Sequence, residues 1–235
     1  MLVLSVQAEE IGRPGAGLRG VRDCELNVND TIGITISAVH SIRVHPMRKP
    51  NEATTAVIMS TVSFTACFAA WVINAVLITF LVTAGVLSLD EKQVATLLAL
   101  PILSGAVSRV PLGILTDRYG GRTVMTLVML IVSGALYAVS FATSYAEFLF
   151  ASVVYGLAGG AYAVGVGFVS SWTPTERQGT ALGVFGAGNV GAALTTALAP
   201  QLLAYFTDHE VNVEGWRMLP KTYAGMMILM AAAFF

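Results

Sequence analysis

Charged side chains are scarce in this sequence. Asp, Glu, Lys and Arg make up 11% of its 235 residues, hydrophobic residues make up 55%, and the mean hydropathy is +0.73. A soluble domain carries about 25% charged residues because its surface has to meet water. The scarcity excludes an ordinary soluble domain and predicts that much of the surface faces lipid. The net charge of -1 indicates nothing about partners, and we expect no nucleic-acid binding.

Cysteine and histidine are also few. The two cysteines do not make a disulfide framework, since Cys67 lies in an apolar run and Cys24 in a polar segment. The histidines His40, His45 and His209 are scattered outside the apolar runs. The sequence has no cluster of Cys and His with metal-ligand spacing, no nucleophile–base pair and no phosphate-binding loop. We therefore expect no metal, no cofactor and no enzymatic activity.

What the sequence does have is long apolar runs separated by short polar connectors. A helix needs roughly 20 apolar residues to cross a hydrocarbon core of about 30 Å. The run lengths and the lack of two-residue alternation exclude strands, and glycine and proline inside the runs suit membrane helices. The pattern predicts an all-α, polytopic membrane protein with five complete helices and a sixth that stops after 13 residues: 56–87, 94–115, 123–142, 148–172, 181–206 and 223–235.

Residues 1–55 differ from the rest of the chain. They carry polar and charged residues at ordinary density, and the opening MLVLSVQAEE has too short an apolar core for a secretory signal. We interpret them as a disordered cytoplasmic leader, and residues 56–235 as a transmembrane helical half-bundle. Met47 opens an alternative start, MRKPNEATTAV, which would leave most of the leader outside the mature protein.

Lys and Arg in the connectors predict the orientation. With the N-terminus inside, the cytoplasmic segments hold nine of these residues and the outer connectors hold three. We therefore expect a cytoplasmic N-terminus. The nine are six in the leader together with Arg118, Arg122 and Arg177, and the three are Lys92, Arg217 and Lys221.

Arg109 lies inside the second run, eight residues before Asp117 and therefore about 12 Å from that end of the helix. An arginine at this depth costs at least ~2.5 kcal/mol on insertion scales, so it needs a partner or a polar cavity. Gly105 and Gly113, four residues to either side, share its face and leave room beside it. The alternative is that the side chain reaches up to the interface and only anchors the helix.

If Arg109 lines a cavity, its guanidinium limits the ligand. The group is permanently charged and planar, and its fork of donors matches two coplanar oxygens. It suits a small oxyanion, but charge does not choose among nitrate, nitrite, carboxylate and phosphate. No Asp or Glu lies well inside the five complete runs, which favours anion exchange over proton symport.

The fourth and fifth runs are rich in glycine. Small residues four apart let two helices touch closely, and tight packing without a ligand explains most of these glycines. Such contacts also allow the sliding that a rocking transporter needs. The spacing occurs at Gly156–Gly160, Gly179–Gly183 and Ala187–Gly191.

Two polar side chains stand out within these runs. Asn189 is a lone amide bracketed by Gly188 and Gly191, and it either bonds to another helix or faces a ligand. Tyr162, deep in the fourth run, either offers its ring and hydroxyl to a cavity or simply packs.

The connector GILTDRYGGR after the second run closely resembles the cytoplasmic loop between helices two and three of the major facilitator superfamily. The resemblance implies a twelve-helix fold, of which this chain would hold the N-terminal six-helix half. It also implies a gate in which Asp117 pairs with nearby positive groups to hold the outward-open state. The loop residues concerned are Gly113, Asp117, Arg118, Gly121 and Arg122.

A narrower resemblance covers about residues 57–235. The segments SRVPLG and GGAYAVGVGFVSSWTPTERQGTALGVFGAGNVGAAL are similar to the nitrate/nitrite porter branch of that superfamily. This resemblance implies that Arg109 clamps the anion, that Asn189 lies in the nitrate signature and that Tyr162 lies beside the substrate. It also implies that the fifth helix moves past its neighbour at Gly186, Gly188 and Gly191.

The family pattern has a second substrate arginine in a C-terminal half, whereas this chain stops inside its sixth run. We therefore expect a fragment whose partners are nitrate or nitrite, the lipid bilayer and the missing C-terminal half. Two alternatives stay open. The chain belongs to a carrier of another small solute with the same fold, or it is a truncated half that only packs or dimerises.

Overall fold

The computed structural model describes residues 50–208 and 212–235. The prediction of a disordered leader concerns mostly residues 1–49, which lie outside the described residues. In the described ranges the chain is helical and contains no strand. Its elements are α1 (Pro50–Thr83), α2 (Glu91–Tyr119), α3 (Gly121–Val139), α4 (Tyr145–Trp172), η3 (Thr175–Arg177), α5 (Gln178–Gly186), η4 (Ala187–Asn189), α6 (Val190–Phe206), η5 (Val213–Arg217) and α7 (Met218–Phe234).

Within residues 50–208 and 212–235, five helical segments are long and apolar enough to cross a membrane. They are α1 to α4 and the continuous segment Thr175–Phe206, which comprises η3, α5, η4 and α6. The sixth helix, α7, has 17 residues. The predicted all-α, polytopic architecture is confirmed.

The helices begin before the predicted apolar runs, and the difference is largest for α1 and α7. The first, α1, begins at Pro50, six residues before the predicted run, and proline suits a first helical position because the N–H it lacks would be unpaired there. The last, α7, begins at Met218, inside the predicted outer connector. Trp216 and Leu219 are almost fully buried, so tertiary packing orders a segment whose polar neighbours hide it from hydropathy.

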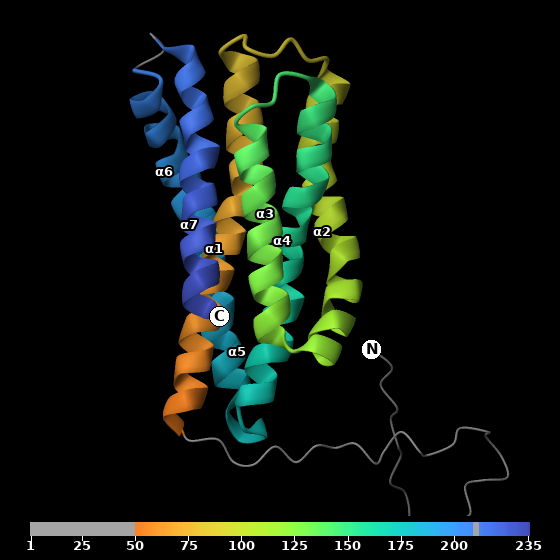
Figure 1. Cartoon of the computed structure of the whole chain (residues 1–235), viewed down its shortest axis with the longest axis vertical. Helices are drawn as coiled ribbons and strands as arrows, with labels where there is room; N and C mark the ends of the chain where they lie inside the picture. The colour runs from red at the N-terminus through yellow and green to blue at the C-terminus, as the bar shows by residue number, and fades with distance from the viewer. Residues whose placement is uncertain (1–49, 209–211) are drawn as a thin grey trace, which may run out of the picture. The chain divides into compact units, whose positions relative to one another are not determined.

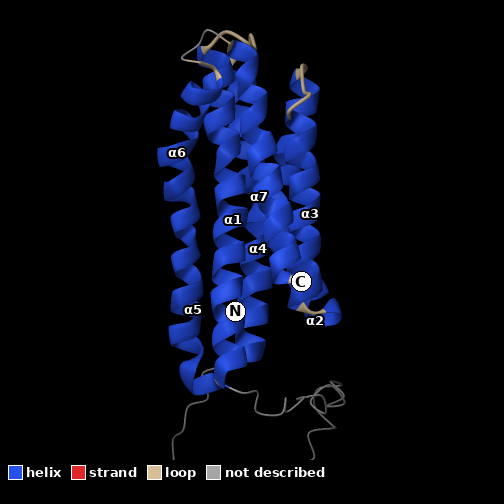
Figure 2. Ribbon diagram, turned by 60° about the vertical axis from the view of Figure 1, so that its left-hand side comes forward, coloured by secondary structure: helices blue, strands red, loops and turns tan. Residues whose placement is uncertain are grey.

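The helices run up and down in a bundle (Figure 1). The second helix, α2, packs along α4, while α1 packs against α4 and α6, and α3 packs against α4 and α7. Figure 2 shows the α5–α6 segment running beside α1. Only Gly120 separates α2 from α3, and its φ of 86° is open to glycine without strain. We call this end of the bundle the α2–α3 end, and the opposite one the α1–α2 end.

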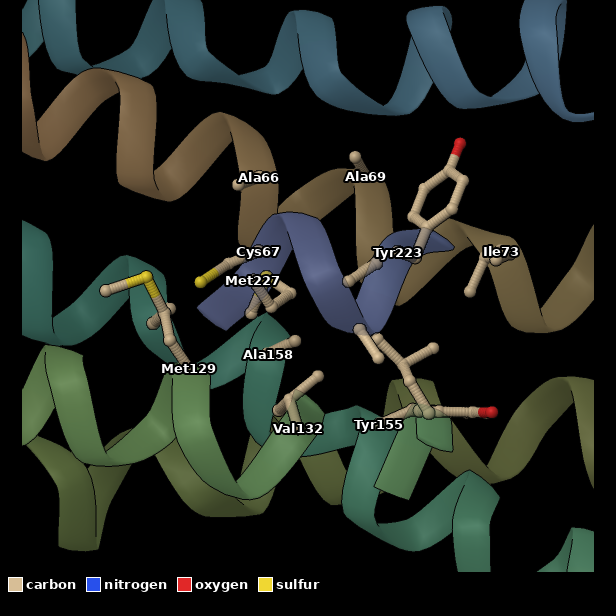
Figure 3. Packing of buried hydrophobic residues seen from close by; sticks show 14 of the residues in the cluster. Ala66, Cys67, Ala69, Ile73, Met129, Val132, Tyr155, Ala158, Tyr223 and Met227 are labelled. Carbon is tan, nitrogen blue, oxygen red and sulfur yellow. The ribbon is translucent and has the colours of Figure 1, made fainter. Parts of the chain in front are cut away.

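The bundle core lies where α1, α3, α4 and α7 meet. Figure 3 shows Cys67 of α1, Met129 of α3, Ala158 of α4 and Met227 of α7 turned toward one another. Each of these side chains is inaccessible to solvent. Packing in this core holds together α1 and α4, which carry residues of the candidate site.

Glycine brings α2 and α4 into close contact. A Cβ added at Gly105 would lie 3.0 Å from the carbonyl oxygen of Gly156, and one added at Gly156 would overlap Ser104. A Cβ at Gly160 would overlap Ser108 in the same way. The backbones therefore touch along this interface, as small residues allow in lipid.

Candidate functional site

Arg109 lies in the middle third of α2, ten residues before the helix ends and thus about 15 Å from the α2–α3 end. The buried face of α2 turns toward α4 and includes its neighbour Ser108. Arg109 itself is exposed. In the described part of the chain, no hydrogen-bond or ion-pair partner of its guanidinium is found.

The exposed surface of α2 divides into two stripes. Residues four apart share a helix face, so Arg109 lies in line with Gly113 and Asp117. The second stripe is purely apolar, and its side chains are between 63% and 69% exposed. It consists of Leu103, Val107, Val110 and Ile114. The apolar side chains of the second stripe suit contact with lipid, whereas the first stripe consists of a glycine and two charged residues.

Aromatic rings form a continuous cluster on α1, α4 and α5, which we call the aromatic cluster. Tyr162 of α4 lies 5.6 Å from Phe64 of α1 and 5.7 Å from Phe185 of α5, measured between ring centroids. The cluster continues along α1 from Phe64 to Phe68 and then to Trp71, with centroid distances of 5.3 and 5.0 Å. Tyr162 keeps 41% of its surface exposed, so its ring borders open space as well as the cluster.

The segment around Asn189 is not continuous α-helix. Residues 187–189 form the 3₁₀ turn η4 between α5 and α6, where the backbone is more tightly wound. The Asn189 side chain is exposed, and its Nδ2 donates to the carbonyl oxygen of Gly186 at 2.8 Å. Asn189 therefore makes a local bond, and of the two alternatives drawn from the sequence, the bond to another helix is not found among the described residues.

The three predicted ligand residues lie at similar depth on separate helices. Ser108, beside Arg109, meets Gly160, which is two residues from Tyr162. Gly188, beside Asn189, abuts Phe64, whose ring contacts Tyr162. These contacts set α2, α4 and η4 at one level of the bundle. Within the described chain, no hydrogen bond or ion pair joins the three side chains.

The other predicted glycines fall into two groups. Gly188 and Gly191 pack against α1, where an added Cβ would meet Phe64 and would overlap the Thr65 carbonyl, respectively. In contrast, no described atom outside the glycine's own helical turn lies within 4 Å of a Cβ added at a second set of positions. This set comprises Gly113, Gly179, Gly183 and Gly186. At Gly113 this agrees with the room expected beside Arg109, whereas at the other three the expected helix packing has no partner among the described residues.

The predicted gate residues gather at the α2–α3 end. Gly121 lies directly under the ring of Phe168, so no side chain fits there. The guanidinium of Arg118 lies 5.6 Å from the ring centroid of Tyr119. Asp117 is exposed and forms no ion pair with any residue in the described ranges. Arg122 borders a hollow of about 500 Å³ between α1, α3, α4 and α7.

A second hollow, of about 610 Å³, lies between α1 and α6 toward the α1–α2 end. Thr79, Thr196 and Pro200 are among the residues that line it. It contains none of the predicted ligand residues and no charged side chain. We therefore do not assign the anion to it.

Sequence reasoning missed the aromatic residues of α1. Phe64, Phe68 and Trp71 follow a helical spacing of four and three residues, which places them on one face. That spacing is the signal that could have found them. Their meeting with Tyr162 and Phe185 depends on tertiary contacts that the spacing does not contain.

The fold and this surface define a class: a polytopic helical membrane protein with an arginine-bearing helix face at mid-depth. The family model described as Major Facilitator Superfamily matches residues 59–235. The chain belongs to this superfamily of membrane transporters, and the resemblance seen in the GILTDRYGGR loop is confirmed.

The chain is similar to several nitrate and nitrite transporters. It is 41% identical over 181 residues to a probable nitrate/nitrite antiporter of Thermus thermophilus, covering 73% of this chain and 39% of that protein. It is 35% identical over 155 residues to a probable nitrate/nitrite transporter of Mycobacterium tuberculosis, covering 63% and 39%. A nitrite extrusion protein of Bacillus subtilis is 26% identical over 173 residues, covering 74% and 41%.

The chain thus spans about two fifths of the length of these relatives. The narrower resemblance to the nitrate/nitrite branch is confirmed as a similarity of sequence. The substrates given in these names are those of the relatives.

Proposed function

We propose that this chain is the N-terminal half of a carrier that moves nitrate or nitrite across a bacterial inner membrane by alternating access. Arg109 binds the anion from this half. The observation that carries the proposal is an exposed guanidinium in mid-helix that has no partner among residues 50–208 and 212–235 and lies on the stripe of α2 with Gly113 and Asp117. Lipid contact would leave that charge uncompensated, whereas a water-filled path with an anion compensates it.

The surroundings of Arg109 support a small planar anion. The aromatic cluster offers ring edges and faces at the same depth, and Tyr162 stays partly exposed there. The η4 turn brings Asn189 to this level and interrupts the regular helix, as carriers often do at a binding site. Similarity to nitrate and nitrite transporters selects nitrate or nitrite among the oxyanions that a guanidinium fits.

The gate and the second half complete the proposal. Asp117, Arg118 and Arg122 lie exposed or at a hollow at the α2–α3 end, free to meet groups of a C-terminal half. Such a half would supply a second cationic group to the anion. The two halves would then rock about the bound anion. With the N-terminus in the cytoplasm, the α2–α3 end is the cytoplasmic end.

The test replaces Arg109 by lysine, which keeps the charge but loses the planar fork. Labelled nitrate uptake is measured in cells without their own nitrate carriers that express this chain together with the C-terminal half of the Thermus thermophilus relative. We expect Arg109→Lys to lose most uptake, about tenfold or more, since a charge-assisted pair is geometry-dependent.

Arg177→Lys is the matched control, because Arg177 is exposed in the η3 turn and away from the stripe. It should transport like the unaltered chain at equal expression. Full uptake by Arg109→Lys would remove Arg109 from the site. Competition of labelled nitrate by excess phosphate or acetate, with none by nitrite, would instead indicate a carrier for another solute.

A further inference from the structure

The second helix, α2, carries a proline eight residues before Arg109, and the helix continues through it. Pro101 is buried within α2 and has no backbone N–H. The carbonyl oxygen of Leu97, four residues earlier, therefore loses the donor that a regular helix would supply. Leu97 is fully buried, so neither water nor lipid replaces that donor.

A side chain of α1 takes the place of the missing donor. Nδ2 of Asn74 donates to the Leu97 carbonyl oxygen at 3.0 Å. At its other end, Oδ1 of Asn74 accepts from Oγ of Ser152 on α4 at 3.4 Å. Asn74 is 3% exposed and Ser152 is inaccessible. The amide is thus held at both ends where α1, α2 and α4 meet.

A second side chain of α1 forms a hydrogen bond with α2 at the same proline. Nε1 of Trp71 donates to the carbonyl oxygen of Pro101 itself at 3.3 Å. Gly159 of α4 lies against the indole, since a Cβ there would be 3.4 Å from Nε1. Trp71 and Asn74 are three residues apart on α1 and so reach α2 from one face.

We infer that Asn74, assisted by Trp71, is a positioning residue that replaces the hydrogen bond removed by Pro101 and so fixes the part of α2 that carries Arg109. Arg109 follows Pro101 by eight residues, about 12 Å along the helix, so a small rotation at the proline displaces the guanidinium. The ligand's identity rests on the proposed function; the positioning itself does not.

A four-variant cycle tests the inference on the purified chain in lipid nanodiscs. The variants are the unaltered chain, Asn74→Leu, Pro101→Ala and the double variant. Pro101→Ala returns an N–H to position 101, which can bond to Leu97. We expect Asn74→Leu to lower the thermal unfolding midpoint clearly when Pro101 is present and to have little effect when alanine replaces it.

Ser133→Ala is the matched control for this cycle. Ser133 is also buried and donates across helices, to the carbonyl oxygen of Ala224 at 2.9 Å, but it is remote from the proline. Its effect on the midpoint should be the same with or without Pro101→Ala. If Asn74→Leu gives no folded protein, recovery of folded protein in the double variant is the expected result. An equal loss for Asn74→Leu in both backgrounds overturns the inference.

A second readout separates positioning from simple stability. Arg109→Cys is introduced with Cys24 and Cys67 replaced by alanine, and its rate of labelling by a small methanethiosulfonate reagent is measured in folded protein. We expect Asn74→Leu to change this rate by about tenfold, because a shift of about 1 Å alters access strongly, and Pro101→Ala to restore it. An unchanged rate also overturns the inference. If Asn74→Leu changes the labelling rate and Pro101→Ala restores it, but the protein does not transport nitrate, the proposed function fails and the positioning role stands.

Discussion

Arg109 combines a fixed positive charge with a depth that lipid does not tolerate. A guanidinium at the middle of a membrane helix costs about 2.5–3.5 kcal/mol on insertion scales. An isolated anchor role would require the side chain to span about 15 Å to the α2–α3 end, which is longer than the side chain itself. Because Gly113 and Asp117 continue its stripe, the charge faces the polar side of α2.

Gly191 tests packing at the level of a single residue. A Cβ at this position would overlap the backbone carbonyl of Thr65 on α1, which cannot move aside as a flexible side chain can. We expect Gly191→Ala to lower the stability of the bundle by about 1–3 kcal/mol, the usual cost of overpacking. Thermal unfolding of the purified protein in detergent would measure this change.

Gly183→Ala is the comparison, since no described atom lies within 4 Å of the Cβ it adds. Its unfolding midpoint should be equal to that of the unaltered chain or higher, because alanine favours helix over glycine. If both substitutions have the same effect, the close contact of α6 with α1 is not what stabilises this part of the fold.

The helices are joined at their ends as well as in the core. Arg217 of η5 donates from one guanidinium nitrogen to the carbonyl oxygens of Ser140 at 2.7 Å and Ala142 at 3.3 Å, just after α3 ends. Its guanidinium also lies over the Trp216 ring, 4.7 Å from the centroid, and pairs with Glu214. A cation at the C-terminal end of α3 donates to carbonyls that have no helical donor, and it interacts favourably with the negative end of the helix dipole.

Arg217→Ala should therefore loosen the connection between α3 and α7. We expect a loss of about 1–2 kcal/mol, since hydrogen bonds to a charged group contribute more than neutral ones but this side chain is partly exposed. Hydrogen exchange of the 136–142 amides, together with the unfolding midpoint, would report the loss. Arg177→Ala is the control, because no described residue pairs with Arg177. Unchanged exchange in both variants would show that the hydrogen bonds of Arg217 do not stabilise the end of α3.

The whole bundle presents two chemically different ends. Glu91 and Lys92 begin α2 at the α1–α2 end, while Glu176 and Arg177 lie in the η3 turn at the opposite end. The predicted cytoplasmic position of the α2–α3 end rests on the positive residues at that end and in residues 1–55 of the sequence. The bundle has one end on each side, so one measured residue at each end is enough to determine its orientation.

Single cysteines at the two ends test this orientation. With Cys24 and Cys67 replaced by alanine, Lys92→Cys should react with a membrane-impermeant maleimide added to intact cells. Glu176→Cys should react only after the cells are opened. The reverse pattern would place the N-terminus outside and would remove the basis for a cytoplasmic gate at Asp117.

The sequence determined the class, the order of the helices and the depth of Arg109. These properties depend on local composition and on the helical rise per residue, which need no knowledge of neighbours. Helix starts were harder to predict, because Trp216 and Leu219 are ordered by burial and not by hydropathy.

Only the tertiary structure decided which groups meet. Asn74 stands out little in the sequence until its amide is found on the carbonyl that Pro101 leaves unpaired on another helix. Tyr162 joins Phe64 and Phe185 through contacts far apart in the chain. The physical reason is that a membrane helix shows its depth and its faces in its own residues, but the partner of each face is chosen by the way the other helices pack against it.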